Sequence, residues 1–313
     1  MAISKRQALR AIAAQARKHA NLSFDPTALL PESTLKEYLR SPEGYYKRFA
    51  EFSEAVPLQR GGHPDYDFLA QEPNIGKTVE GNVTTFFMDL KNFTKYCCFL
   101  SPGKVYQAKY ATIESIIGVC HIHGGHLHDL TGDGVMVFFG GKSTNDLEAA
   151  RNALDAAADS MQLLEREVIP EYNDNSHYPN IHPKIGLDFG NVLWGAYGAP
   201  PVFEVKATAF NVDVANKMMS ERNSQEVAIG DELKKLLGVD EDEYLETGWI
   251  YNRQMTVNGE EKKISYKTWV FDWRKHLRDR NEEDKDLARM GVVTVNAPVV
   301  TKSRTTLGDA PLA

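Results

Sequence analysis

The sequence predicts an α/β (α+β) fold with a ferredoxin-like βαββαβ core, and three observations support this fold class. An apolar run rich in β-branched and aromatic residues, Val83–Asp89, predicts a strand. A helical pattern follows, and then two apolar runs joined by Gly132-Asp133, a pair suited to a tight hairpin turn. A second helix and further strands complete the order of the split βαβ plan.

The helices and later strands follow from periodicity and from the residues that end each segment. Apolar residues at helical spacing between Tyr106 and Ile117 predict one buried helix face. Ser143-Thr144-Asn145 offers N-caps for a long helix that Pro170 ends. We then expect a second hairpin that turns at Gly190-Asn191, a helix over 211–222 and a short strand over 226–229.

Composition changes on both sides of this core and predicts four segments. Residues 1–78 read as an N-terminal helical appendage, and residues 79–238 as the core domain. Residues 239–300 read as a C-terminal extension with a hairpin that turns at Asn258-Gly259 and a solvated, mixed-charge helix over 275–290. Residues 301–313 read as a tail.

The overall composition is that of a soluble globular protein. The 313 residues are 42% hydrophobic and 25% charged, and no apolar run approaches the roughly 20 residues that span a bilayer. A formal charge of −7 argues against a broad nucleic-acid surface. The three cysteines form no Cys-x-x-Cys pair and suit a reducing compartment, so we expect a cytoplasmic protein.

Two aspartates occupy the positions where a site is expected. Asp89 ends the first strand, and Asp133 lies in the turn of the first hairpin. If the hairpin lies beside the first strand, both carboxylates converge at one end of the sheet. Two carboxylates at such a point suit hard divalent cations that also bind phosphate oxygens.

Three stretches around these residues carry a family resemblance: FFMDLKNFT, GGHLHDLTGDGVMVFFG and KIGLDFGNVLWGAYG. Together they resemble the class III nucleotidyl cyclases, whose members share the adenylate/guanylate cyclase catalytic domain. The resemblance implies that Asp89 and Asp133 bind two Mg²⁺ or Mn²⁺ ions, with the carbonyl of Leu90 as a third ligand. One ion would activate the ribose 3′-hydroxyl, and the other would neutralise the phosphates of the leaving pyrophosphate.

Substrate contacts are expected next to these ligands. The backbone N–H groups of Lys91, Asn92, Phe93 and Thr94 stand at a helix start, where they would cradle phosphate oxygens. The resemblance adds Phe86 to the substrate contacts.

The family reads the base at the position of Asp129, four residues before the second metal aspartate. Members that cyclise ATP typically have lysine there, and guanylate cyclases have glutamate. Aspartate accepts hydrogen bonds and cannot donate one, so this position does not favour adenine.

A later motif resembles the family pattern V-N-x-A-x-R. Val212–Lys217 fits it without a gap, which places Asp213 at the ribose-positioning residue and Lys217 at the transition-state arginine. In this register Lys206 is the second base-reading residue. A shift by two would select Asn211 and Glu204 instead but would lose the cation, so we prefer the first register.

Asp129 and Lys206 provide one acceptor and one donor, which match the N3–H and a carbonyl of uracil. Cytosine, through its amine, and guanine also remain possible. The chain further resembles the bacterial pyrimidine cyclases of the Pycsar antiphage system. That resemblance implies conversion of UTP to 3′,5′-cyclic UMP and pyrophosphate, a second messenger for a separate effector in antiviral defence.

The alternatives within the enzyme class are a cytidylate or a guanylate cyclase. An alternative of another class is a non-catalytic, nucleotide-binding regulatory module. The missing arginine favours the module, whereas the two metal aspartates argue against it. The resemblance also implies a head-to-tail homodimer with shared active sites, and we expect neither nucleic acid nor membrane as a partner.

Overall fold

The computed structural model describes residue 12 and residues 78–141, 144–170, 181–199, 202–223, 225–238 and 244–289. Apart from Ile12, the expected N-terminal appendage lies outside the described residues up to position 77, as does the expected tail over 301–313.

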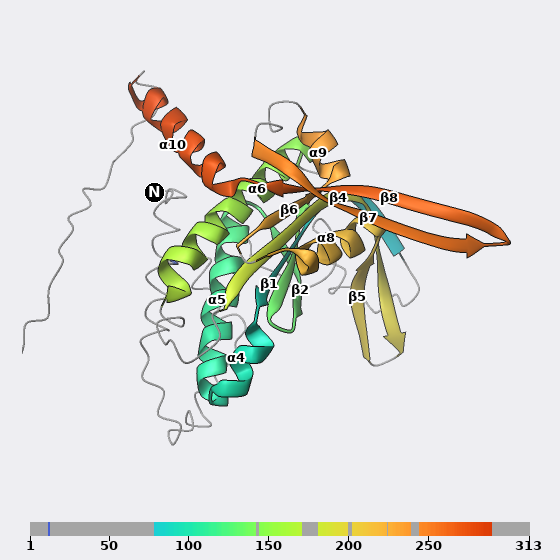
Figure 1. The fold of residues 1–313 in the computed structure, drawn as a ribbon, viewed down its shortest axis with the longest axis horizontal. Coiled ribbons are helices and arrows are strands. Elements are labelled where there is room, and N and C mark those ends of the chain that lie inside the picture. Colours follow the sequence, from blue (N-terminus) through green and yellow to red (C-terminus); the bar gives the residue numbers. More distant parts are fainter. Residues whose placement is uncertain are drawn as a thin grey trace, which may run out of the picture.

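The described chain contains eight strands, three consecutive pairs of which form hairpins, and helices separate the rest (Figure 1). The elements are β1 (Thr78–Lys91), α4 (Phe93–Phe99), α5 (Pro102–Ile122), β2 (His126–Thr131), β3 (Gly134–Gly140), α6 (Asp146–Leu163), the π-helical turn η1 (Leu164–Val168), β4 (His182–Ala199), β5 (Val202–Thr208), α8 (Phe210–Glu221), β6 (Val227–Gly230), α9 (Asp231–Leu237), β7 (Leu245–Val257), β8 (Glu260–Phe271) and α10 (Trp273–Arg289).

All eight strands belong to one sheet. Its order is β2-β3-β1-β4-β6-β8-β7, and β5 pairs with β4 outside this path. β1 lies antiparallel between β3 and β4, whereas β4 and β6 are parallel. The order β2-β3-β1-β4, with a helix after β1 and another after β3, is the ferredoxin-like arrangement, so the predicted fold class is confirmed.

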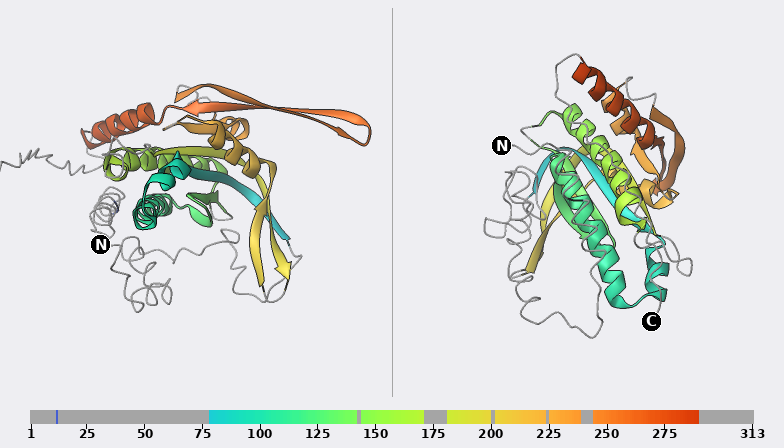
Figure 2. Two further views of the ribbon diagram at one scale, coloured as in Figure 1. Left: turned by 60° about the horizontal axis from the view of Figure 1, so that its bottom comes forward. Right: turned by 90° about the vertical axis from the view of Figure 1, so that its left-hand side faces the viewer.

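Successive side chains of β1 point to opposite faces of the sheet and pack into two separate hydrophobic cores. Phe86 and Met88 pack into the larger core with α5 and α6. Val83 and Phe87 point to the opposite face and pack into the smaller core with α8. Figure 2 shows the helical layers on the two sides of the sheet. We call the side of the sheet that packs against α8 the α8 face.

The expected turn at Gly190-Asn191 is wrong. β4 runs unbroken for 18 residues and pairs with β1 through this point, and the chain turns only after Ala199. Gly186 and Gly190 instead leave the space in which α8 packs closely on β4. A Cβ atom at Gly186 would lie 2.3 Å from the backbone oxygen of Ala215, and one at Gly190 would lie 3.0 Å from Cγ of Asn211.

The expected buried face of α5 begins later than the sequence suggests. Tyr106 is 54% exposed and stacks on Tyr110 with a ring-centroid distance of 5.9 Å. The buried residues of α5 begin at Ala108 with small side chains and continue through Ile116 and Ile117, where α5 packs on the alanine-rich helix α6.

The hairpin turn at Asn258-Gly259 is confirmed. Both residues have positive φ angles, 54° and 82°, as a primed two-residue turn requires. β8 pairs with β6 at its inner end, so the hairpin continues the core sheet. The division of the chain into four segments stays a prediction.

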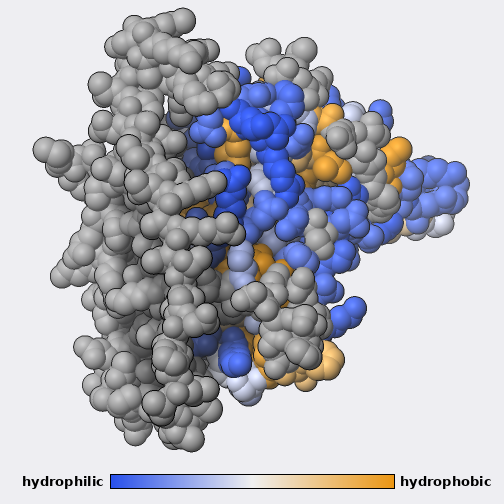
Figure 3. All heavy atoms as spheres, turned by 60° about the vertical axis from the view of Figure 1, so that its left-hand side comes forward, coloured by the Kyte–Doolittle hydropathy of each residue, from blue (hydrophilic) through white to orange (hydrophobic). Residues whose placement is uncertain are grey.

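Hydrophilic side chains predominate among the described residues on the face seen in Figure 3, with small hydrophobic patches between them. Within the described ranges, no helix has the length and apolar character that crossing a membrane requires.

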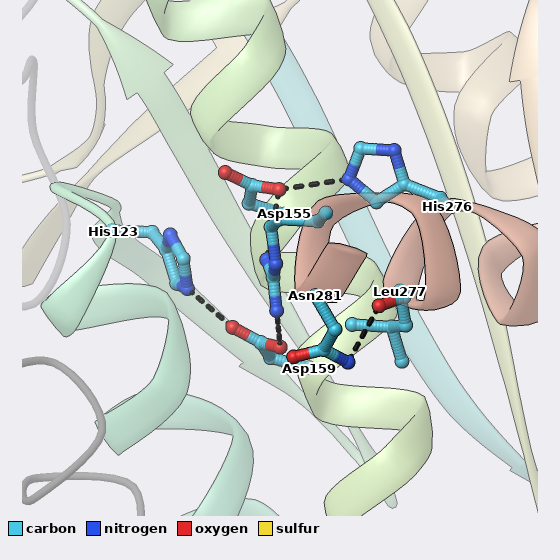
Figure 4. A network of polar contacts seen from close by, with 7 residues as sticks. His123, Asp155, Asp159, His276, Leu277 and Asn281 are labelled. Atoms are coloured by element: carbon cyan, nitrogen blue, oxygen red, sulfur yellow. Dashed lines mark hydrogen bonds and ion pairs between the residues drawn. The ribbon is translucent and has the colours of Figure 1, made fainter. Parts of the chain in front are cut away.

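A polar network fastens the C-terminal helix α10 to α6 (Figure 4). Arg280 donates hydrogen bonds to Asp155, at 2.9 Å, and to the buried Asp159. His276 approaches Asp155 to 2.8 Å, and His123 at the end of α5 approaches Asp159 to 2.9 Å. Burial opposes ionisation of Asp155, but the hydrogen bond from His276 and the charge of Arg280 lower its pKa to about 2. The mixed-charge helix is therefore docked on one side.

Replacing Arg280 should destabilise the fold. Arg280→Leu leaves the carboxylate of Asp159 buried without its cation, so we expect a loss of about 2–3 kcal/mol in the free energy of unfolding, measured by urea denaturation. Arg274→Leu is the matched control because Arg274 pairs with Glu165 at a half-exposed site. Its loss should stay under about 1 kcal/mol. Equal losses for the two variants would contradict this account of the network.

A second buried carboxylate, Asp188, joins β4 to β8. The hydroxyl of Tyr266 donates to Asp188 at 2.7 Å and accepts the N–H of Glu232 at 2.9 Å. A Cβ atom at Gly230 would lie 2.2 Å from the carboxylate, so only glycine leaves room for it. Burial raises the pKa of Asp188 to about 7, against the opposing effect of the hydrogen bond from Tyr266.

Asp188→Asn should change how stability depends on pH. Because the folded pKa lies above the unfolded value of about 3.9, ionisation of Asp188 disfavours the folded state as pH rises from about 4 to 7. The stability of Asp188→Asn relative to wild type should therefore increase over this range, by up to about 4 kcal/mol, and stay level above it. Denaturation at several pH values measures the difference.

Asp279→Asn is the control for this experiment, since Asp279 pairs with Lys275 at the surface of α10. A difference between Asp188→Asn and wild type that is independent of pH would show that Asp188 titrates normally.

Candidate functional site

The two aspartates predicted as metal ligands come together at one end of the sheet. β1 delivers Asp89 at its C-terminal end, and β3 pairs beside it. Thr131 pairs with Gly134, so Asp133 lies in a two-residue turn with Gly132 at φ 66°. A Cβ atom at Gly134 would lie 2.2 Å from the backbone oxygen of Met88. The close crossing that glycine permits brings the turn against the end of β1.

The electrostatics reflect this proximity. Burial raises the pKa of Asp133, and the charge of Asp89 and a hydrogen bond with it raise that pKa further. Two carboxylates that share a site repel each other unless a proton or a cation lies between them. The pair is therefore arranged to attract positive charge.

Lys184 is a site residue that the sequence analysis missed. It stands opposite Asp89 in the β1–β4 ladder, and its Nζ lies 3.6 Å from Oδ2 of Asp89. The lysine is buried, with 7% of its surface exposed. Lys184 is the first residue of the family-like stretch KIGLDFG, which could have drawn attention to it. Only the pairing of β4 with β1, however, shows that Lys184 reaches Asp89.

The donor set suits Mg²⁺ or Mn²⁺. Asp89, Asp133 and the carbonyl of Leu90 offer hard oxygen ligands, which these ions prefer. Within the ranges that the structure describes, no group of three or more His, Cys, Asp or Glu side chains could hold a metal ion. Two carboxylates are few for a self-sufficient site but suffice for Mg²⁺ that takes further ligands from substrate phosphates and water.

A β-bulge aims Asp129 at the α8 face. Leu127 pairs with Val137, but Asp129 pairs with Met136, so β2 contains one extra residue between them. Without the bulge, alternation would place Asp129 on the same side as Leu127, in the core with α5 and α6. Instead it aligns with Met136, which belongs to the α8-face core.

Asp129 and Lys206 form an ion pair within one chain. Nζ of Lys206 lies 2.5 Å from Oδ2 of Asp129 and 3.1 Å from Oε2 of Glu204. The hydrogen bond with Asp129 raises the pKa of Lys206. Lys206 is 40% exposed at its side chain, so a ligand has access to the pair. The two residues predicted to read the base therefore meet, although they come from β2 and β5.

The residues of α8 favour the register without a gap. Asp213 and Lys217 are one helical turn apart and exposed. Asn211 is 5% exposed, packs against Gly190 and donates to the hydroxyl of Thr85 at 3.3 Å. Its amide is thus used inside the fold. Within the described ranges, no hydrogen bond or ion pair joins Asp213 or Lys217 to Asp89 or Asp133.

The residues after Asp89 begin a helix as expected. Asn92 has a left-handed conformation with φ 68°, and α4 starts at Phe93. The side chain of Phe93 is buried, so it is the backbone N–H groups of Lys91, Asn92, Phe93 and Thr94 that remain candidates for phosphate contact.

The assignment of Phe86 to the substrate is wrong for its side chain. Phe86 is fully buried, packs 6.1 Å from Phe139 between ring centroids, and lies on the opposite face of β1 from Asp89.

Comparisons with known proteins agree with this geometry. The family model of the adenylate and guanylate cyclase catalytic domain matches residues 76–271. A cytidylate cyclase from Escherichia coli is 33% identical over 192 residues, which cover 59% of this chain and 41% of the relative. A cytidylate cyclase from Staphylococcus aureus is 28% identical over 225 residues, 71% of this chain and 52% of the relative. The chain thus spans about half the length of these curated relatives.

Solved structures share the fold. The crystal structure of the guanylyl cyclase Cya2 aligns with a TM-score of 0.50 at 20% identity, over 62% of this chain and 92% of that one. A bacterial light-regulated adenylyl cyclase aligns with a TM-score of 0.52 at 15% identity, over 81% and 65%. With its family match over most of its length and two carboxylates meeting where β1 ends, the chain belongs to the adenylate and guanylate cyclase catalytic domain family, the class III nucleotidyl cyclases.

Proposed function

We propose that this chain cyclises a pyrimidine nucleoside triphosphate to its 3′,5′-cyclic monophosphate and pyrophosphate, and that UTP is the substrate. The observation that carries the cyclase reaction is the convergence of Asp89 and Asp133 at the end of β1. The ion pair between Asp129 and Lys206 is compatible with a pyrimidine, because it offers one acceptor and one donor to the edge of the base.

CTP is the second candidate. Cytosine presents an amine to Asp129 and a ring acceptor to Lys206, so the same pair fits it. Three curated relatives are named cytidylate cyclase, which favours this base.

In the proposed reaction, Asp89, Asp133 and the carbonyl of Leu90 hold two divalent ions. These ions would supply acidification of the ribose 3′-hydroxyl and charge neutralisation on the triphosphate. The N–H groups that begin α4 would bind phosphate oxygens, and the ammonium group of Lys184 adds a positive charge beside Asp89. Lys217 would stabilise the developing charge, and Asp213 would orient the ribose.

The site needs a second copy of the chain. Asp213 and Lys217 are exposed on α8 and are not joined to the carboxylates of their own chain, so we propose that they complete the site of the partner in a head-to-tail homodimer. By its resemblance to antiphage pyrimidine cyclases, we also propose that the protein is cytoplasmic and that its product signals to a separate effector in antiviral defence.

Product analysis tests the reaction. The purified chain is incubated with Mn²⁺ and with ATP, GTP, CTP or UTP separately, and the products are identified by mass spectrometry. We expect cyclic UMP, and a fall of roughly 100-fold or more for Asp133→Asn because the metal site loses a charged ligand. The control Asp279→Asn, at a surface ion pair, should keep wild-type activity.

The alternative outcomes are distinct. Cyclic CMP would retain the mechanism and change the base, and cyclic GMP would overturn the pyrimidine assignment. Nucleotide binding without any product from the four triphosphates would identify a regulatory module instead of an enzyme.

Complementation tests the shared site. Asp133→Asn and Lys217→Ala should each be nearly inactive alone. When equal amounts of the two variants are mixed and allowed to exchange subunits, roughly a quarter of wild-type activity should return. Half of the dimers are then mixed, and each mixed dimer has one intact site of two. If pull-down through an affinity tag on one variant shows that mixed dimers have formed, failure to recover activity would place both residues in the site of one chain.

A further inference from the structure

The outer part of the β7–β8 hairpin projects beyond the body of the protein. We call residues 250–267 the arm. Figures 1 and 2 show it extending past the rest of the sheet. β6 pairs with β8 only from Thr268 to Phe271, so the described strands of the arm pair only with each other. A ribbon of two strands is marginally stable in water without a surface to pack against.

The outer part of the arm carries two exposed apolar side chains on one face, whereas the exposed Ile250 lies at the root of the arm on the other face. Cross-strand partners share a face, and Arg253 pairs with Ile264 while Met255 pairs with Lys262. Met255 is 60% exposed and Ile264 is 46% exposed. Tyr251, over which Arg253 stacks, belongs to the same face. Long apolar side chains on an unsupported strand attract other chains, so their presence here indicates a binding surface.

This face continues into α8. Tyr266 pairs with Tyr251 at the root of the arm, and its ring packs edge-on against Phe210, the first residue of α8, at 5.3 Å. Phe210 is itself 46% exposed. The hydrogen bonds between Tyr266 and Asp188 fix this root to β4. The apolar face thus leads to the helix that carries Asp213 and Lys217, the residues assigned above to a partner's site.

Charge favours a second copy as the occupant. The arm contains four basic and two acidic residues, a net charge of +2. Since the whole chain has a net charge of −7, the remainder carries −9. A basic arm would therefore be attracted to the acidic body of another copy.

We propose that the arm binds a second copy of this chain, with Met255 and Ile264 at the contact, and holds the two protomers so that α8 of each faces the carboxylates of the other. The inference rests on the shared active site of the proposed function. In this arrangement, the arm would give the dimer apolar area beyond the catalytic surfaces.

The test is a pair of double variants on opposite faces of the arm. Met255→Asp with Ile264→Asp changes the apolar face. Thr256→Asp with Ser265→Asp adds the same two charges to the other face, at residues that are also exposed. Sedimentation velocity over a range of concentrations gives the dimer dissociation constant. We expect an increase of at least about tenfold for the apolar-face variant and little change for the control.

Activity provides a second measurement that misfolding would not reproduce. The apolar-face variant should lose activity per molecule at low protein concentration and recover it at high concentration, because mass action restores the dimer. Its KM at the high concentration should equal that of wild type. Unchanged dimerisation of the apolar-face variant, or equal weakening by both variants, would overturn the proposal.

The outcomes separate this inference from the proposed function. A wild-type chain that dimerises through the arm but forms no cyclic product would contradict the cyclase assignment and leave the arm contact standing. A wild-type chain that stays monomeric at every concentration would overturn the arm contact, and product formation by that monomer would also overturn the shared site.

Discussion

The site depends on two like charges that the fold brings together. Asp89 and Asp133 meet because the turn before β3 crosses the end of β1 at Gly134, where a side chain would collide with the backbone of Met88. Proximity raises the pKa of Asp133, so the folded chain stores an unfavourable interaction that a cation would relieve. Lys184 on β4 relieves part of it. Strands β1, β3 and β4 must therefore be adjacent for the site to exist.

β4 connects this site to the rest of the molecule. Residues 182–195 of β4 pair with β1 on one side. On the other side, residues 185–187 pair with β6 and residues 193–199 pair with β5. β4 carries Lys184 beside Asp89 and Asp188 at the root of the arm. Gly186 and Gly190 of β4 let α8 lie close to the sheet, which fixes the helix that presents Asp213 and Lys217. One strand thus positions the residues of the proposed active site and those of the proposed dimer contact.

The sequence predicted the features that depend on local patterns. The hairpin with Asp133, the strand with Asp89 and the turn at Asn258-Gly259 have the residues that these conformations require, and all are confirmed. Features that depend on distant segments were missed. Gly190 resembles a turn residue until α8 is seen packing on it, and Lys184 becomes a site residue only through its pairing with Asp89.

The bulge in β2 shows why base recognition was the hardest part to predict. One extra residue rotates Asp129 onto the α8 face, where Lys206 neutralises it before any ligand arrives. In the proposed function, a base would replace this existing ion pair, and binding would gain only if the base offers a donor to Asp129 and an acceptor to Lys206 together. Uracil, cytosine and guanine all meet that condition, and so does adenine through its amine and its ring nitrogen N1. Contrary to the expectation from Asp129 alone, hydrogen bonding at this pair does not disfavour adenine, and the choice between a pyrimidine and a purine falls to the space around the pair, where the larger ring system must fit.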